Sequence, residues 1–175
     1  MEITVTTMIP FPIDDVYLAL QDHLPELAQY MPNIENITIE KREEHADGWL
    51  HVLNRWQTAP TEIPKVAKPF IDRDKTYWFD HAKWHRPSYK CNWHLEMSFM
   101  PDRIECQGTT SFHRKTDQQT EMRITGSLHI NLKGMVPRIL LRRASSGVEK
   151  FIGRLVQPNF QKTAEAITSY LESQK

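Results

Sequence analysis

The sequence predicts an α+β domain in which an antiparallel sheet supports one long C-terminal helix. Apolar residues recur at three- and four-residue steps from Val148 to Leu171, a spacing typical of a helix with one buried face. Between residues 34 and 133 the apolar period changes to two, which is typical of half-buried strands. The length of 175 residues and the lack of internal repeats favour a single domain covering residues 1–175.

A strand followed by two short helices is predicted at the start of the chain. Residues Glu2–Met8 alternate β-branched and polar side chains, as in a strand. Apolar residues from Ile13 to Leu20 then follow helical spacing, and Asp14 and Asp15 occupy the first turn, where the helix dipole favours anions. A second helical segment is predicted from Leu24 to Met31, before Pro32.

Six further strands are predicted, near residues 35–43, 48–57, 73–84, 88–100, 103–115 and 120–133. A two-residue turn at Pro101-Asp102 would place Met97 opposite Cys106. The next connection needs an odd number of loop residues to keep the apolar faces matched. Gly108 and Gly126 would leave the inner surface of the sheet locally bare, so we expect open space there.

The last helix contains a proline in its middle. Pro158 has no N–H to bond the carbonyl of Arg154, so we expect either a bend or two helices in series.

Charge and composition exclude several classes of protein. Lys plus Arg equals Asp plus Glu, 22 of each, so no nucleic-acid partner is expected. The charge is uneven, because residues 14–47 hold nine acids against two bases and residues 133–154 hold six bases against one acid. No signal peptide or membrane-spanning run is recognisable, and a cytoplasmic location is expected.

The polar residues predict neither a metal site nor a cofactor. His81 and His85 lie on a predicted strand and turn, where a four-residue spacing converges poorly, and no HExxH motif occurs. No nucleophile elbow or phosphate-binding glycine loop is present. Cys91 and Cys106 are predicted to be inert core thiols, too far apart for a disulfide.

Asp80 is the most informative single residue, and two orientations remain open for it. If Trp78, Ala82 and Trp84 point inward, Asp80 does too, opposite Trp93, where burial would raise the pKa of its carboxyl. That carboxyl would then serve as an acid or base, or anchor a ligand hydroxyl. In the other frame Asp80 is exposed and His81 points inward.

The order of elements resembles the START-like, helix-grip superfamily, which includes polyketide cyclases and small lipid-binding proteins. The stretches that carry the resemblance are FPIDDVYLALQD, PNIENITI, WHLEMSFMPDRIECQGTTSF and VEKFIGRLVQPNFQKTAEAITSYL. The resemblance implies a curved sheet of about seven strands, in the order β-α-α-β6-α, around the C-terminal helix. It also implies a cavity between sheet and helix that holds an apolar molecule. The residues expected to line it are Trp78, Asp80, Trp93, Leu95, Met97, Cys106, Thr110, Phe112, Leu128, Ile130, Phe151, Leu155 and Phe160.

Two functions are consistent with such a cavity. One is a carrier or sensor for a hydrophobic small molecule such as a lipid, isoprenoid or polyketide-like compound. The alternative is a cyclase, aromatase or hydratase that uses a pocket acid or base. Two accessory features are also predicted, a lid over the cavity at Gln57–Phe70 and transient docking to a membrane or a protein through Arg138, Arg142 and Arg143.

Overall fold

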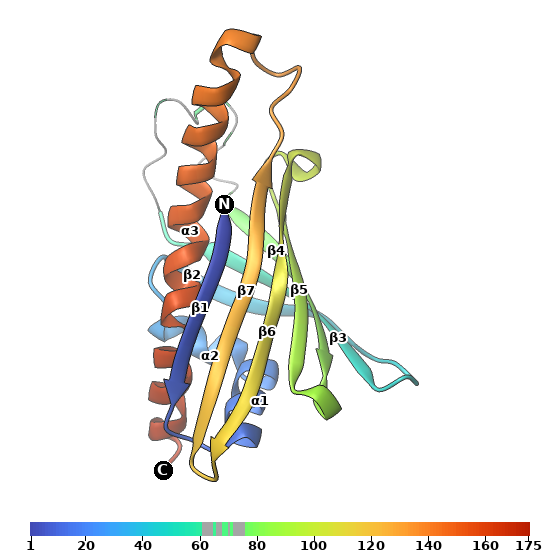
Figure 1. Cartoon of the computed structure of the whole chain (residues 1–175), viewed down its shortest axis with the longest axis vertical. Helices are drawn as coiled ribbons and strands as arrows, with labels where there is room; N and C mark the ends of the chain where they lie inside the picture. The colour runs from blue at the N-terminus through green and yellow to red at the C-terminus, as the bar shows by residue number, and fades with distance from the viewer. Residues whose placement is uncertain (61–64, 66–67, 70, 72–75) are drawn as a thin grey trace.

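The computed structural model describes residues 1–60, 65, 68, 69, 71 and 76–175. Its described part contains one antiparallel sheet of seven strands, in the order β1-β7-β6-β5-β4-β3-β2, which curves beside one long helix (Figure 1). The strands are β1 (Glu2–Ile9), β2 (Ile34–Glu44), β3 (Trp49–Thr58), β4 (Tyr77–His85), β5 (Lys90–Met97), β6 (Ile104–Thr116) and β7 (Gln119–Ile130). The helices are α1 (Ile13–Asp22), α2 (Leu24–Leu27) and α3 (Arg138–Ser173). The predicted α+β class and the predicted order of elements are both confirmed.

The inner face of the sheet and the apolar face of α3 form the hydrophobic core. Phe151, Ile152 and Ile167 of α3 are completely buried, as are Met122 and Ile124 of β7. Figure 1 shows α3 running along β1 and β7, while α1 and α2 lie at the lower end of the sheet. The concave side of the sheet is therefore covered by helices.

Helix α3 begins ten residues earlier than predicted and continues through Pro158 as one helix. Pro137 immediately precedes it, where a proline ring suits the start of a helix. Two side chains bond to backbone carbonyls near Pro158: Asn159 Nδ2 donates to Leu155 O at 2.8 Å, and Thr163 Oγ1 donates to Asn159 O at 2.6 Å. The alternative of two helices in series is wrong.

The predicted register of the β5–β6 hairpin is wrong by two residues. Leu95, not Met97, lies opposite Cys106, and Trp93 lies opposite Gly108. The connection is longer than two residues because Met100 adopts a left-handed conformation and a 3-10 turn follows at Pro101–Arg103. A shift of two residues keeps every side chain on its predicted face.

The β6–β7 connection also differs from the prediction. Thr116 pairs with Gln119 across a two-residue loop, where an odd number was expected. An irregularity between Arg114 and Thr116 supplies the extra residue, so that Phe112 still lies opposite Met122.

The two inner-face glycines accommodate a tryptophan ring instead of opening space. Gly108 and Gly126 are paired on β6 and β7. A Cβ atom on Gly108 would lie 2.5 Å from Cζ2 of Trp93, and one on Gly126 would lie 2.7 Å from its Cη2. The indole of Trp93 therefore fills the region that was predicted to be open.

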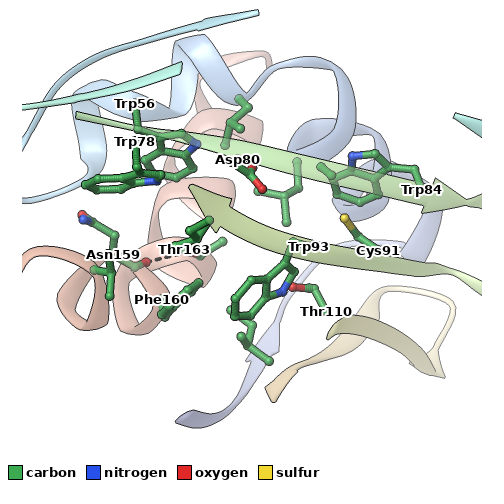
Figure 2. Close-up of a pocket in the computed structure, with 16 residues that line it drawn as sticks. Trp56, Trp78, Asp80, Trp84, Cys91, Trp93, Thr110, Asn159, Phe160 and Thr163 are labelled. Atoms are coloured by element: carbon green, nitrogen blue, oxygen red, sulfur yellow. Dashed lines mark hydrogen bonds between the residues drawn. The ribbon is translucent and has the colours of Figure 1, made fainter. Parts of the chain in front are cut away.

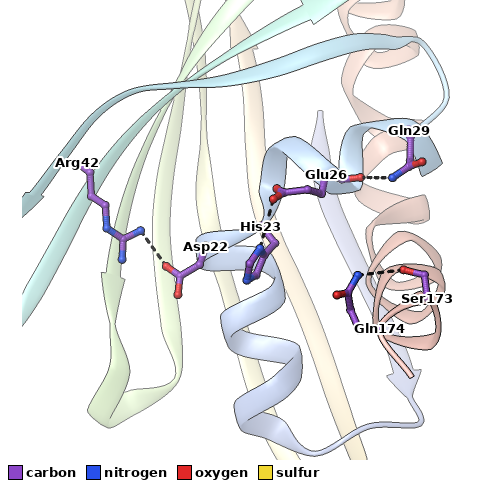
Figure 3. A network of polar contacts seen from close by, with 7 residues as sticks. All are labelled: Asp22, His23, Glu26, Gln29, Arg42, Ser173 and Gln174. Carbon is purple, nitrogen blue, oxygen red and sulfur yellow. Dashed lines mark hydrogen bonds and ion pairs between the residues drawn. The ribbon is translucent and has the colours of Figure 1, made fainter.

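Polar and aromatic contacts attach the small helices to the rest of the domain. Asp22, at the end of α1, forms a 2.8 Å ion pair with Arg42 of β2, and His23 bonds to Glu26 within the same turn (Figure 3). The His23 ring also stacks on Tyr170 of α3 at 5.2 Å. These contacts hold α1 and α2 between the far edge of the sheet and the C-terminal end of α3.

Two predictions are only partly covered. The predicted lid at Gln57–Phe70 lies outside the described residues except for 57–60, 65, 68 and 69, and residues 57 and 58 belong to β3. The first residues of the strand predicted at 73–84 also lie outside them. Within the described chain, no helix is long and apolar enough to cross a membrane.

Candidate functional site

A cavity of about 70 Å³ lies between the concave face of the sheet and the helices (Figure 2). Its walls come from strands β3 to β7 and from all three helices. The lining residues are Leu20, Leu24, Trp56, Trp78, Asp80, Ala82, Trp84, Cys91, Trp93, Leu95, Thr110, Ile124, Val156, Asn159, Phe160 and Thr163. Four tryptophans and a phenylalanine make this wall strongly aromatic.

Six of the thirteen residues predicted for the cavity wall do line it: Trp78, Asp80, Trp93, Leu95, Thr110 and Phe160. The remaining seven do not, namely Met97, Cys106, Phe112, Leu128, Ile130, Phe151 and Leu155. Six of these seven are buried in the hydrophobic core, and Ile130 packs against that core partly exposed. The core is solid along most of the sheet, so an inward orientation alone does not bring a residue to the cavity.

The sequence prediction missed ten lining residues. Ala82 and Trp84 share the inward frame of Asp80 on β4, and Trp56 shares the inward face of Leu50 and Val52 on β3. Asn159 and Thr163 are more distinctive, because they place two polar side chains one turn apart on the otherwise apolar face of α3. That interruption of an apolar stripe is the signal that would have found them.

The inward frame of β4 decides the orientation of Asp80. Its side chain is 8% exposed, and its strand partner is Leu95, not Trp93. Asn54 of β3, directly opposite on the neighbouring strand, donates from Nδ2 to Asp80 Oδ2 at 3.2 Å. Figure 2 shows the carboxyl between the indoles of Trp56 and Trp78 and that of Trp84.

Burial changes the acidity of this carboxyl. Removal from water raises the pKa of Asp80 from 3.8 to about 6, because desolvation penalises the charged form. The Asn54 amide and the Trp56 indole N–H act in the opposite direction, since both favour the carboxylate. Asp80 is therefore half-titrated near pH 6, and at neutral pH most of it is the carboxylate.

On the opposite wall, Asn159 is 3% exposed and uses its Nδ2 within the helix. Across the cavity, the ring of Trp93 stacks on Phe160 with centroids 5.0 Å apart and so joins β5 to α3. The edge of the same Trp93 indole packs against Gly108 and Gly126.

Several buried polar atoms of the wall have no hydrogen-bond partner of standard geometry among the described residues. They are Asp80 Oδ1, Trp56 Nε1, Trp93 Nε1 and Asn159 Oδ1. Native structures leave few buried polar atoms unpaired, since each costs about 1–3 kcal/mol. An apolar wall with this concentration of unpaired polar atoms is suited to a molecule that carries its own polar groups.

The two cysteine thiols near Asp80 are unsuited to nucleophilic chemistry. Burial raises the pKa of the Cys91 thiol well above its usual value and that of Cys106 to about 12, so both thiols stay neutral. Both cysteines are free and buried, in agreement with their prediction as core residues. Across the described ranges, no group of three or more His, Cys, Asp or Glu residues is placed to hold a metal ion.

Comparison with protein families identifies the chain at the level of family. Residues 4–171 match the model described as "Protein of unknown function (DUF2505)". The chain belongs to this DUF2505 family. No curated protein matches it.

Solved structures of similar shape confirm the fold of this DUF2505 protein. TTHA0849 from Thermus thermophilus is 17% identical with a TM-score of 0.69, and the match covers 100% of this chain and 99% of that one. The ZhuI aromatase/cyclase from Streptomyces sp. R1128 is 14% identical with a TM-score of 0.68, over 99% and 94% of the two chains. A START superfamily protein from Mycobacterium smegmatis is 10% identical with a TM-score of 0.52, over 99% of each chain. The predicted resemblance to START-like proteins is therefore confirmed at the level of the helix-grip fold.

Proposed function

We propose that this protein binds a small, mostly hydrophobic molecule in the cavity between the sheet and α3, as a carrier or sensor. The observation that carries the proposal is the wall itself, in which four indole rings surround a buried carboxyl and several unpaired polar atoms. Aromatic and aliphatic surface supplies affinity at about 25 cal/mol per Å² buried, while a few polar groups fix orientation. The resemblance in fold to an aromatase/cyclase is consistent with a ring-containing or polyketide-like ligand.

The size of the cavity limits what enters it without rearrangement. At about 70 Å³ it is roughly half the size of a cavity that accommodates benzene, about 150 Å³. A lipid or isoprenoid needs a larger space, so binding would require Phe160 to move away from Trp93. We expect this stack to be the part of the wall that yields.

Native mass spectrometry of the purified protein tests the proposal. A stoichiometric apolar adduct that is released by solvent extraction is the expected result, and the extract then defines the ligand class. Trp93→Ala should change the retention of the adduct, whereas Trp49→Phe, on the outer face of β3, should leave it unchanged. An adduct that the two variants retain equally would contradict binding in this cavity.

The alternative function is an enzyme that acts on such a ligand. It is favoured by Asp80, because a buried carboxyl with a pKa of about 6 exchanges protons readily near neutral pH. Among the described residues that line the cavity, the other ionisable side chain is the neutral Cys91 thiol, so none of them is a second acid or base beside Asp80. Conversion of the extracted ligand over time by the wild type, and not by Asp80→Asn, would favour the enzyme; an unchanged ligand mass supports the carrier.

A second surface favours docking to an anionic membrane. At the start of α3, Ile139 is 90% exposed and Leu140 49% exposed, and Met135 just before the helix is 41% exposed. Arg138, Arg142 and Arg143 lie among them. In Figure 1 this end of α3 extends beyond the upper end of β7, so none of the described strands covers it. Exposed apolar side chains flanked by arginines match the interface of an anionic bilayer, where each basic residue contributes about 1 kcal/mol.

Co-sedimentation with liposomes at low salt tests this docking. Vesicles containing phosphatidylserine should retain the wild type, and neutral vesicles should not. Replacing Ile139 and Leu140 by serine should abolish retention without loss of stability, because both side chains are exposed. Equal recovery of wild type and variant with anionic vesicles would rule out docking through this end of α3.

A further inference from the structure

Asp80 is a buried negative charge without a positive partner in the described lining of the cavity. Its side chain is 8% exposed, and at neutral pH most of it is the carboxylate. The two side chains whose hydrogen bonds favour that carboxylate, the Asn54 amide and the Trp56 indole, are both neutral. Folded proteins pair buried charges with opposite ones, because removing an unpaired charge from water is costly.

The surroundings of Asp80 supply little positive charge. The described residues that line the cavity include no Lys, Arg or His. Of the titratable groups that interact with Asp80, Cys91 and Cys106 are neutral thiols. A third, His81, lies on the outer face of β4, where its Nε2 is 3.0 Å from Glu96 Oε2. His81 affects the pKa of Asp80 less than burial and the two hydrogen bonds do.

Indole rings surround the same carboxyl. Figure 2 shows it between Trp56 and Trp78 on one side and Trp84 on the other, and Trp93 adds a fourth indole to the wall. The face of an aromatic ring carries partial negative charge, and among the aromatic side chains an indole attracts cations most strongly. A cation in this cavity would therefore be attracted by the carboxylate and by the rings together.

The cavity has room for a small charged group. It measures about 70 Å³, whereas a water molecule in the liquid occupies about 30 Å³. An ammonium group is of similar size to a water molecule, so it fits within the present cavity. The carboxylate also has unused acceptor capacity, since it offers about four lone-pair sites to its two neutral donors. A larger organic body would need the movement of Phe160 described above.

We propose, on the basis of the binding function above, that the ligand is an organic cation whose positive charge lies against Asp80 and the surrounding indoles. A protonated amine and a quaternary ammonium both meet this description. The hydrophobic body of the ligand then packs on the aromatic wall, which includes the stacked pair of Trp93 and Phe160. A ligand carboxylate or phosphate would be repelled by Asp80, and a neutral hydrocarbon would leave the buried charge unpaired.

Calorimetric titration with benzylamine, which is protonated at pH 8, and with benzyl alcohol tests the proposal, because the two compounds have similar shapes and differ in charge. The amine should bind the wild type at least about tenfold more tightly, since hydrogen bonds between charged groups are strong. Asp80→Asn should lose this preference and keep its affinity for the alcohol. Trp78→Leu should reduce the preference about threefold or more, because it removes one indole. Asp117→Asn, which changes a carboxyl that is 95% exposed, is the matched control and should retain the preference.

The pH profile of binding is an independent readout. The amine stays charged from pH 8 to pH 5, whereas Asp80, with a pKa of about 6, is ionised in only about a tenth of the molecules at pH 5. The affinity of the wild type for benzylamine should therefore fall about tenfold over this range, and its affinity for benzyl alcohol should stay level. In Asp80→Asn both affinities should stay level.

The outcomes separate this inference from the binding function on which it rests. Equal or tighter binding of benzyl alcohol by the wild type overturns the cation site and leaves a hydrophobic binding function intact. If neither compound binds, the native adduct decides. A cationic adduct that Asp80→Asn loses supports the proposal, and a neutral or anionic adduct, or a cationic one that this variant retains, overturns it. A protein with no adduct and no binding contradicts both.

Discussion

Replacing Asp80 by asparagine should remove a pH dependence from the stability of the protein. The pKa of Asp80 rises from 3.8 to about 6 on folding, which corresponds to about 3 kcal/mol at about 1.4 kcal/mol for each tenfold change in proton affinity. Because the folded state holds the proton more tightly, wild-type stability gains this amount as pH falls from about 7 to about 4, and loses it as pH rises through 6. Asparagine is uncharged throughout this range.

Urea denaturation of the two proteins between pH 4 and pH 8 measures the effect. The free energy of unfolding of Asp80→Asn minus that of the wild type should increase by up to about 3 kcal/mol from pH 4 to pH 8. Histidines such as His51 and His94, whose pKa values burial lowers, titrate in the same window. They are present in both proteins, so their contribution cancels in the difference.

Asp117→Asn is the matched control. The Asp117 side chain is 95% exposed in the β6–β7 turn, so this substitution should leave the pH profile parallel to that of the wild type. A difference between Asp80→Asn and the wild type that stays constant across the pH range would refute the reasoning. It would mean that Asp80 titrates as an exposed carboxyl and that the cavity is well hydrated.

Three further predictions concern the walls of the cavity. Gly126→Ala places a Cβ 2.5 Å from Gln107 O and 2.7 Å from Trp93. The free energy of unfolding, measured by urea denaturation, should therefore fall by about 1–3 kcal/mol, and the near-UV circular dichroism of the indole should change. An unchanged spectrum and an unchanged urea midpoint would contradict this packing of Trp93 on Gly126. Phe160→Ala should lower the free energy of unfolding by about 3 kcal/mol. Because it removes the ring that stacks on Trp93, it should also strengthen the binding of toluene in calorimetry. Weaker binding of toluene would show that the stack does not restrict the cavity. Asn54→Ala removes a hydrogen bond that favours the Asp80 carboxylate, so the pKa of Asp80 should rise further. The loss of stability that accompanies ionisation of Asp80 should then occur at a higher pH than in the wild type. A shift of this loss to lower pH would argue against the hydrogen bond.

The fold was predictable because its strands and last helix have regular apolar periods. Strict alternation from Tyr89 to Phe99 fixed which face of that strand is buried, and the structure confirms the face. The register was not predictable. It depends on the left-handed Met100 and on a 3-10 turn, neither of which the sequence Pro101-Asp102 distinguishes from a two-residue turn. An error of two residues still preserves the face, which explains why a wrong register gave a correct core.

The site was predictable only in part, because a cavity is the region where packing fails and periodicity carries no information about it. Trp93 was found from its inward frame, and Trp78 and Asp80 from one of the two frames left open for their strand. The same criterion selected Cys106 and Leu128, which lie in solid core. The glycines at 108 and 126 were taken to open space, but the larger effect is that Trp93 fills it. Which large side chain occupies a bare position is decided by tertiary packing.

Polar residues within the apolar stripe of α3 were the missed signal. Asn159 and Thr163 were assigned to neither the core nor the cavity from the sequence. Both are buried and line the cavity, and both bond to the helix backbone beside Pro158. Two polar residues one turn apart on a buried helix face indicate either an irregularity of the helix or a binding site. Asn159 and Thr163 lie both beside the helix proline and in the cavity wall.

The indole N–H signals in a two-dimensional proton–nitrogen NMR spectrum test the central claim most directly. The chain has five tryptophans, of which Trp56, Trp78, Trp84 and Trp93 line the cavity and Trp49 lies on the outer face of β3. Titration with a small ring compound, or with the extracted ligand, should shift the signals of the four lining indoles and leave that of Trp49 in place. Shifts confined to Trp49, or none at saturating ligand, would contradict a binding site between the sheet and α3.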